Sequence, residues 1–98
     1  MSNKTAIRKV TLGEQHIRPG RTKHTLIDAN GARPFPPFTS LVITRCLLPD
    51  DNGFYLEHLC ADGLGTDTWH QTLEDALHQA EWEFGVHPTE WIEVNEPF

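Results

Sequence analysis

The clearest pattern of apolar positions lies in the second half of the chain. Residues 39–48 form a β-branched, apolar run that is long enough for a buried central strand. A turn-forming cluster follows at 49–53, and residues 54–61 form a returning apolar run, which indicates a hairpin. Residues 66–70 supply a third strand after a second turn that contains glycine. This succession predicts an antiparallel meander over 39–70.

Helical periodicity is clear only over residues 72–84. A step of about 100° per residue gathers five apolar residues of this segment into a single stripe. They are Leu73, Ala76, Leu77, Ala80 and Phe84. Thr72 is a favourable N-cap, Asp75 completes a pair that resembles a capping box, and Gly85 is a typical stop residue. The segment therefore predicts one capped helix whose apolar stripe packs on one face of the sheet.

The first half of the chain carries weaker patterns. Residues 5–12 alternate in part, which predicts a strand with Ile7, Lys9 and Thr11 on one side. Residues 25–28 predict a short strand that ends at the turn dipeptide Asn30–Gly31.

Proline dominates the segment 33–38, where three prolines occur within four residues. Because proline lacks a backbone donor, this segment is expected to be neither helix nor central strand. An extended, polyproline-like path would lay Phe35 and Phe38 on an apolar surface. At the other end of the chain, residues 91–94 predict a last short strand, followed by a frayed tail.

A chain of 98 residues is expected to form one domain with little stability to spare. The patterns predict a single α+β domain over residues 1–98. Its antiparallel sheet has three to five strands, and one capped helix packs on one face. The compact core is expected over 39–94, whereas residues 1–38 are basic and rich in proline and glycine.

The net charge of −6 conceals a strong polarity along the chain. All eight Lys and Arg residues lie at or before Arg45, and twelve of the fourteen acids lie at or after Asp50. Residues 1–49 therefore carry +6 and residues 50–98 carry −12. This polarity predicts that the first half folds back against the acidic half, or that the molecule presents two surfaces of opposite sign.

No apolar run approaches the roughly 20 residues that a membrane helix needs. The N-terminus also lacks the apolar core of a secretory signal. We therefore expect a cytoplasmic protein that does not bind membranes and has no cofactor. Cys46 and Cys60 lie in apolar segments, and we expect both to be free thiols in the core.

One alternative is a metal- or thiol-dependent protein. If the first hairpin has a loop of odd length, Cys46, His58 and Cys60 share one sheet face, and His70 could be a fourth ligand. A slip of one residue would separate the two cysteines onto opposite faces. Since core thiols need no metal, no metal site is the favoured interpretation.

The candidates for catalysis are weaker still. Acids beside His70 are explained by helix capping, and the negative local charge argues against a reactive thiolate at Cys60. We therefore expect that the protein is not an enzyme.

A second alternative is nucleic-acid binding through the basic loop that contains Arg18, Arg21 and Lys23. Binders of single strands also need aromatic residues between the cations, and this loop has none. The anionic field of the whole chain opposes attraction of phosphate. A solvated loop, or an internal partner for the acidic half, is the favoured interpretation.

Trp82 is the most informative single residue. It falls about 180° from Leu73, opposite the apolar stripe, with the polar residues Asp75, His78 and Gln79 as angular neighbours and Glu81 beside it. Either the first half of the chain covers it, or it contacts a protein partner or a second copy. These five residues, Asp75, His78, Gln79, Glu81 and Trp82, are the candidate partner-binding site.

Residues 67–91 carry a longer pattern, Trp-x-x-Thr-Leu-x-x-Ala-x-x-Gln-Ala-x-x-Glu-Phe-Gly. It resembles a segment of small bacterial α+β proteins, most without an assigned function and some similar to immunity proteins. The resemblance implies a capped helix packed on a hairpin and brings no catalytic residues with it. With the charge pattern, it leads us to expect a non-catalytic protein-interaction module, in its sharper form an immunity-type binder of a basic partner.

Overall fold

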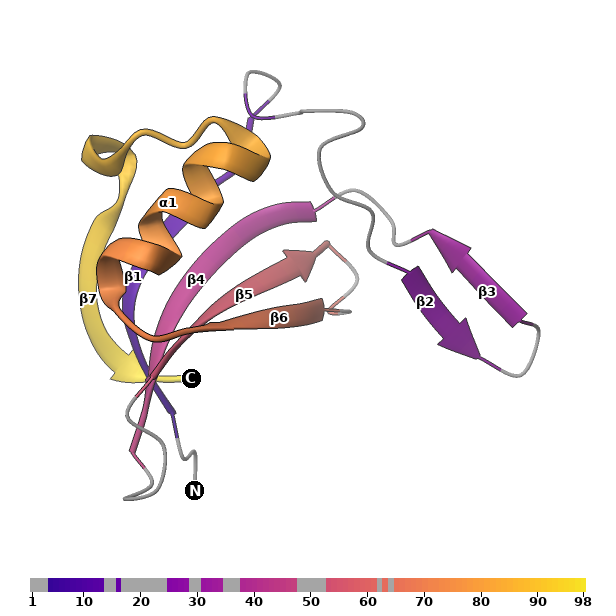
Figure 1. Ribbon diagram of the computed structural model, residues 1–98, viewed down its shortest axis with the longest axis horizontal. Helices are drawn as coiled ribbons and strands as arrows, with labels where there is room; N and C mark the ends of the chain where they lie inside the picture. The colour runs from indigo at the N-terminus through magenta and orange to yellow at the C-terminus, as the bar shows by residue number, and fades with distance from the viewer. Residues whose placement is uncertain are drawn as a thin grey trace.

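The computed structural model describes residues 4–13, 16, 25–28, 31–34, 38–47, 53–61, 63 and 65–98, with the strands at 25–28 and 32–34 described by their backbone. Five strands form an antiparallel sheet, and one helix lies across one of its faces (Figure 1). The strand order is β6-β5-β4-β1-β7. The expected α+β class and the sheet with one packed helix are confirmed.

The meander is formed by β4 (Phe38–Cys46), β5 (Phe54–Cys60) and β6 (Gly65–His70). Arg45 lies opposite Phe54, and Tyr55 lies opposite Trp69. The β4–β5 pairing shifts register between Phe38 and Ser40. Because directly opposite residues in an antiparallel pair share a face, the register assigns the paired side chains of the meander to one of the two faces. The face that α1 covers is called the α1 face below, and the opposite one is called the far face.

Strand β1 (Lys4–Thr11) lies between β4 and β7 and confirms the strand predicted over 5–12. Its pairing shifts register between Ala6 and Arg8, so Ile7 forms a bulge and packs against the core. The simple alternation predicted for Ile7 and Lys9 is therefore wrong, because a bulge inserts one residue and reverses the face of those before it.

Strand β7 (Ile92–Pro97) is longer than the strand predicted over 91–94. Glu96 lies opposite Ala6, and Pro97 lies opposite Thr5. The predicted frayed tail is therefore wrong through Pro97, because β1 offers an edge that pairs with it. Proline is tolerated there since an edge strand needs its donors on one side only.

A separate hairpin is formed by β2 (Thr25–Asp28) and β3 (Gly31–Pro34). Figure 1 shows it set apart from the five-stranded sheet. Strand β2 was expected. Strand β3 was not, because the prolines that begin at Pro34 hide a short strand that ends on the first of them.

Helix α1 (Leu73–Phe84) has the predicted ends. The Thr72 hydroxyl accepts the backbone N–H of Asp75 at 3.1 Å, and Gly85 adopts the left-handed conformation with φ of 70°. The short 3₁₀ helix η2 (Pro88–Glu90) then leads into β7. Within the described part of the chain, no helix combines the length and the apolar character needed to cross a membrane.

The core lies between α1 and the sheet. The predicted stripe faces it: Ala76 and Ala80 are fully buried, and Leu73, Leu77 and Phe84 pack at its margin. From the other elements the core contains Val10, Leu41, Ile43, Leu56, Val86 and Trp91.

Candidate functional site

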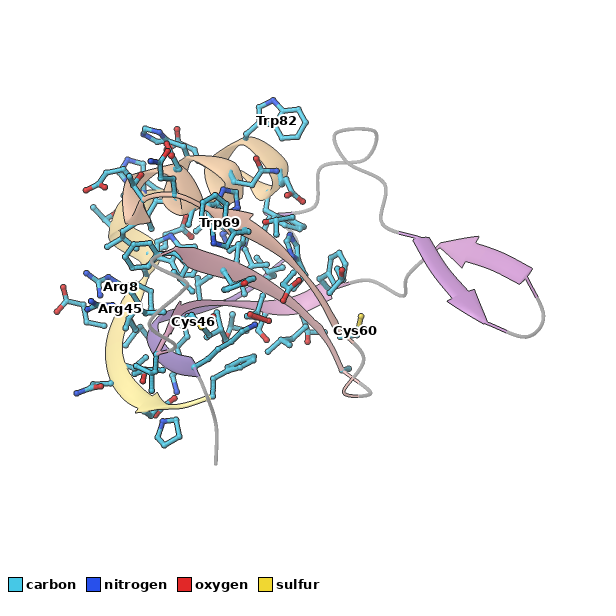
Figure 2. All side chains as sticks on the ribbon, turned by 60° about the horizontal axis from the view of Figure 1, so that its bottom comes forward. Arg8, Arg45, Cys46, Cys60, Trp69 and Trp82 are labelled. Carbon is cyan, nitrogen blue, oxygen red and sulfur yellow. The ribbon has the colours of Figure 1, made fainter. Side chains whose placement is uncertain are left out.

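Trp82 lies on the side of α1 that points away from the sheet (Figure 2). Its side chain keeps 50% of its surface exposed. The helix geometry explains this position, because the fully buried Ala76 and Ala80 occupy the opposite side of the same helix. Nothing within the described residues buries the indole completely, so the surface expected at Trp82 is accessible.

The other residues of the candidate site divide into two groups. Asp75, His78 and Glu81 are exposed beside Trp82. Gln79 is half-buried, and its amide donates a hydrogen bond of 2.6 Å to the Oε1 atom of Glu83. Gln79 therefore has a role inside the protein, while the side chains of Asp75, His78 and Glu81 are exposed to solvent.

A buried His58–Glu83 pair lies beneath this surface. The Nε2 atom of His58 is 3.4 Å from the Oε2 atom of Glu83, and both residues are almost fully buried, with 0% and 2% exposed. Gln79 holds the other carboxylate oxygen of Glu83. The pair connects β5 to α1 through polar contacts inside an otherwise apolar interface.

Aromatic rings enclose the His58–Glu83 pair. The ring centroid of His58 lies 5.2 Å from that of Phe38 and 5.8 Å from that of Phe84. The expectation that Phe38 packs on an apolar surface is thereby confirmed, whereas Phe35 lies outside the described residues. This enclosure keeps both members of the pair out of contact with solvent.

The expected site residues did not include Glu83, which the structure places in buried contact with His58. The residue spacing does place Glu83 at one margin of the apolar stripe, because it follows Ala80 by three residues and Ala76 by seven. A carboxylate at such a position needs a buried polar partner, and His58 was the partner that the sequence did not reveal.

His70 lies near the same cluster, at the end of β6. Its Nε2 atom is 2.7 Å from the hydroxyl oxygen of Thr68. Burial lowers the pKa of His70, the charges of Asp75 and Glu83 oppose that shift, and the charge of His58 adds to it.

A second charged cluster lies on the far face of the sheet. The Lys4 ammonium is 3.0 Å from Glu57 and 3.3 Å from Asp67, and it sits 3.9 Å from the centroid of the Tyr55 ring. Glu57 also accepts a hydrogen bond of 3.2 Å from Thr44. The Lys4 side chain thus crosses β4 and connects β1 to β5 and β6.

The pKa values of this pair move in the same direction. Burial raises the pKa of the Glu57 carboxyl, helped by the charge of Asp67, although Lys4 and Thr44 act against it. Burial would lower the pKa of Lys4, but its hydrogen bonds to Glu57 and Asp67 and their charges outweigh that effect and raise it. The pair therefore stabilises the charged form of Lys4, while it offsets only part of the cost of burying the Glu57 carboxylate.

Two further cations of β1 reach acids of β7. Arg8 lies 3.4 Å from Glu93, and Lys9 lies 3.2 Å from Glu96. With Lys4, these contacts show that β1 folds back on acidic residues of the second half, one of the two outcomes that the charge polarity predicts. For the acids Glu74, Asp75 and Glu81 of α1, no ion pair within 4.0 Å to a Lys or Arg occurs among the described residues.

His16 fastens the segment after β1 to the turn before β7. Its Nε2 atom is 2.8 Å from Glu90, and its Nδ1 atom accepts the backbone N–H of Gly13 at 2.9 Å. The second oxygen of Glu90 accepts the N–H of His87, and this backbone hydrogen bond, together with His16, lowers the pKa of Glu90. His16 is 2% exposed, so these contacts join the two segments inside the protein.

The hairpin register determines whether the thiol and metal candidates lie on the same face of the sheet. Cys46 lies opposite Lys4 on the far face, whereas His58 and Cys60 lie on the α1 face. Figure 2 shows the two cysteines well apart. The three residues therefore do not converge, because the loop of even length between Arg45 and Phe54 produces the separating register. Among the described residues, no group of three His, Cys, Asp or Glu side chains is arranged to hold a metal ion, and this includes His70.

The nucleic-acid candidates Arg18, Arg21 and Lys23 lie outside the described residues. Comparisons of the chain with protein-family models, with curated proteins and with solved structures give no match.

Proposed function

We propose that this protein is a non-catalytic protein-interaction module that binds a basic partner through the outer face of α1. The observation that carries the proposal is Trp82, half-exposed on a helix whose exposed acids have no described Lys or Arg partner. The docking surface consists of Glu74, Asp75, His78, Glu81 and Trp82, which we call the acidic helix face.

The charges of this surface favour a cationic partner. Glu74, Asp75 and Glu81 repel one another along the helix, and Glu81 also lies near its negative end. A basic partner would relieve both effects, and unneutralised surface charge increases the rate of association with the opposite sign. Trp82 would supply the apolar contact around which such a surface excludes water.

Burial supports a non-catalytic role. The His58–Glu83 pair combines groups that could serve in acid–base chemistry, but the pair is sealed beneath α1, between Phe38 and Phe84. A catalytic base must come within hydrogen-bonding distance of its substrate. These two residues are therefore assigned to holding α1 on the sheet.

The proposal is tested with a short poly-L-lysine as a cationic probe, followed by tryptophan fluorescence and calorimetry at low and high salt. We expect salt-sensitive binding that is weakened several-fold by the double substitution Glu74→Gln/Glu81→Gln and also by Trp82→Ala. The matched control is Glu93→Gln/Glu96→Gln, which removes the same charge from acids that Arg8 and Lys9 already neutralise.

An equal loss of binding in the two charge variants would show that only net charge matters and would overturn the proposal. Trp82→Ala is expected to leave Tm nearly unchanged, because half of the side chain is exposed. A large fall in Tm would instead assign Trp82 to the interior.

The finer form of the proposal is an immunity-type role, in which the acidic helix face neutralises a basic protein such as a nuclease. Carboxylates on such a surface mimic the phosphates that a nuclease binds. Co-expression with the product of an adjacent gene tests this form. Protection that is lost with Glu74→Gln/Glu81→Gln and kept with Glu93→Gln/Glu96→Gln is the expected result, and equal protection by both would contradict it.

A further inference from the structure

The outer edge of β6 offers a row of backbone donors and acceptors for another strand. β6 is the terminal strand of the five-stranded sheet, and no described segment pairs with its outer side. It pairs with β5 from Leu59↔Gly65 to Phe54↔His70 without a register shift. Its residues contain no lysine and no proline, and they include the β-prone Thr66, Thr68 and Trp69.

The other edge of the sheet is protected. Strand β7 contains Pro97 and the acids Glu93 and Glu96, and its pairing with β1 is interrupted by the bulge between Ala6 and Arg8. Proline, charge and bulges are the features by which natural proteins block edge pairing. The two edges thus differ, and β6 is the one suited to accept a strand.

The single carboxylate on β6 is Asp67, which lies 3.3 Å from the Lys4 ammonium and shares that cation with Glu57. Beside it, Trp69 is 53% exposed, and its indole lies directly over Gly53, where any side chain would overlap the ring. The edge therefore presents an unshifted strand with one carboxylate, which is partly neutralised within the chain, and one exposed aromatic side chain.

We propose that two copies of the chain pair through β6 in an antiparallel dimer whose two-fold axis passes through Thr68. The six residues of β6 allow two centres with maximal overlap, Asp67 and Thr68. Centring on Asp67 would place two carboxylates directly opposite each other, which is unfavourable.

Centring on Thr68 avoids that contact. Thr68 then opposes its own copy, Asp67 opposes Trp69 of the second copy, and Thr66 opposes His70 of the second copy. Threonine pairs are favourable cross-strand neighbours. The two five-stranded sheets become one continuous sheet with both copies of α1 on the same side, because opposite residues share a face. This interface is separate from the acidic helix face.

Cysteine cross-linking tests the register. In a Cys46→Ala/Cys60→Ala background, Thr68→Cys places two thiols directly opposite, at a Cα separation of about 4.5–5.5 Å that a disulfide can bridge. Thr66→Cys is the matched control, since residue 66 would lie about 13 Å along the strand from its own copy. We expect oxidation to cross-link Thr68→Cys about tenfold faster than Thr66→Cys. Similar rates for the two variants would overturn the register.

Sedimentation velocity over a range of concentrations tests the dimer itself. We expect a species of twice 11.2 kDa. Trp69→Glu places like charges opposite each other and should abolish it, whereas Trp69→Arg places a cation opposite Asp67 and should retain it. Thermal unfolding checks that both variants are folded. A monomer at the highest soluble concentration, or a dimer lost with Trp82→Ala but kept with Trp69→Glu, would overturn the proposal.

Discussion

The charges of β1 form ion pairs with other strands, whereas the exposed charges of α1 do not form ion pairs with a described cation. Lys4, Arg8 and Lys9 each contact acids from the second half of the chain. The exposed acids Glu74 and Glu81 of α1 have no such contact with a described cation. Part of the charge along the sequence therefore forms ion pairs between strands of the sheet, and part stays as exposed carboxylates on the helix.

For the two lysines, the sheet register explains this division. Lys4 and Lys9 lie on the far face, opposite Cys46 and Val42 of β4. From there they reach acids on the same face of β5, β6 and β7, but the sheet separates them from α1. Net charge along a sequence therefore says little about surface charge until the sheet face of each charged residue is known.

The largest expected effect is a loss of stability when the buried Glu83 of α1 is replaced, compared with replacement of its exposed neighbour Glu81. Glu83→Ala leaves His58 buried without its carboxylate, and loss of one member of a buried pair costs about 3–5 kcal/mol. At about 4–8 °C per kcal/mol for a domain of this size, Tm should fall by more than about 10 °C.

Thermal and urea unfolding measure this effect, with Glu81→Ala as the control on the same helix. The control should change stability by no more than about 0.5 kcal/mol, because Glu81 is exposed. Equal losses in the two variants would mean that the His58–Glu83 contact does not hold the helix on the sheet.

A smaller loss of stability is expected when lysines of β1 are replaced, and it should differ between Lys4 and Lys9. Lys4→Met leaves the buried Glu57 without its cation and should cost about 2 kcal/mol, the scale of hydrogen bonds to charged groups. Lys9→Met removes an exposed pair and should cost less than about 1 kcal/mol. Urea unfolding checks both, and adding Glu57→Gln to Lys4→Met should recover part of the loss. If that second substitution recovers nothing, the Lys4–Glu57 contact does not account for the cost.

The smallest effect is a pH dependence from Glu57. Because burial raises the pKa of its carboxyl above the 4.5 of an unfolded glutamate, the folded state binds this proton more readily. Stability contributed by Glu57 therefore falls as the pH rises from 4.5 through the higher folded value. Glu57→Gln removes this dependence.

The difference in unfolding free energy between Glu57→Gln and the native chain should thus shift in favour of the variant as the pH rises through that window. Urea unfolding at a series of pH values measures it, with Glu93→Gln as the control for loss of one exposed carboxylate. A difference that stays constant with pH would contradict the assignment.

Local patterns predicted most of the elements, because their signals are short-range. Thr72 and Gly85 marked the helix ends through capping chemistry, and the apolar runs marked the strands of the meander. The bulge at Ile7 and the continuation of β7 to Pro97 were missed. Both depend on the neighbouring strand, which no local pattern encodes.

For the candidate site, helical periodicity alone placed Trp82 on the polar side of α1, since a step of 100° per residue is intrinsic to any helix. The same reasoning placed Gln79 with it but could not show that its amide is used by Glu83. The separation of Cys46 from His58 and Cys60 depended on a loop of even length, which the sequence left open.

The sequence by itself determined the capped helix, the meander and the excess of negative charge in the second half, because these follow from residue spacing and composition. Only the tertiary structure decided which acids are neutralised, which one is buried against His58, and which of the described strands form the two edges of the sheet. Those outcomes depend on strand order and register, and these bring residues together that are far apart in the chain.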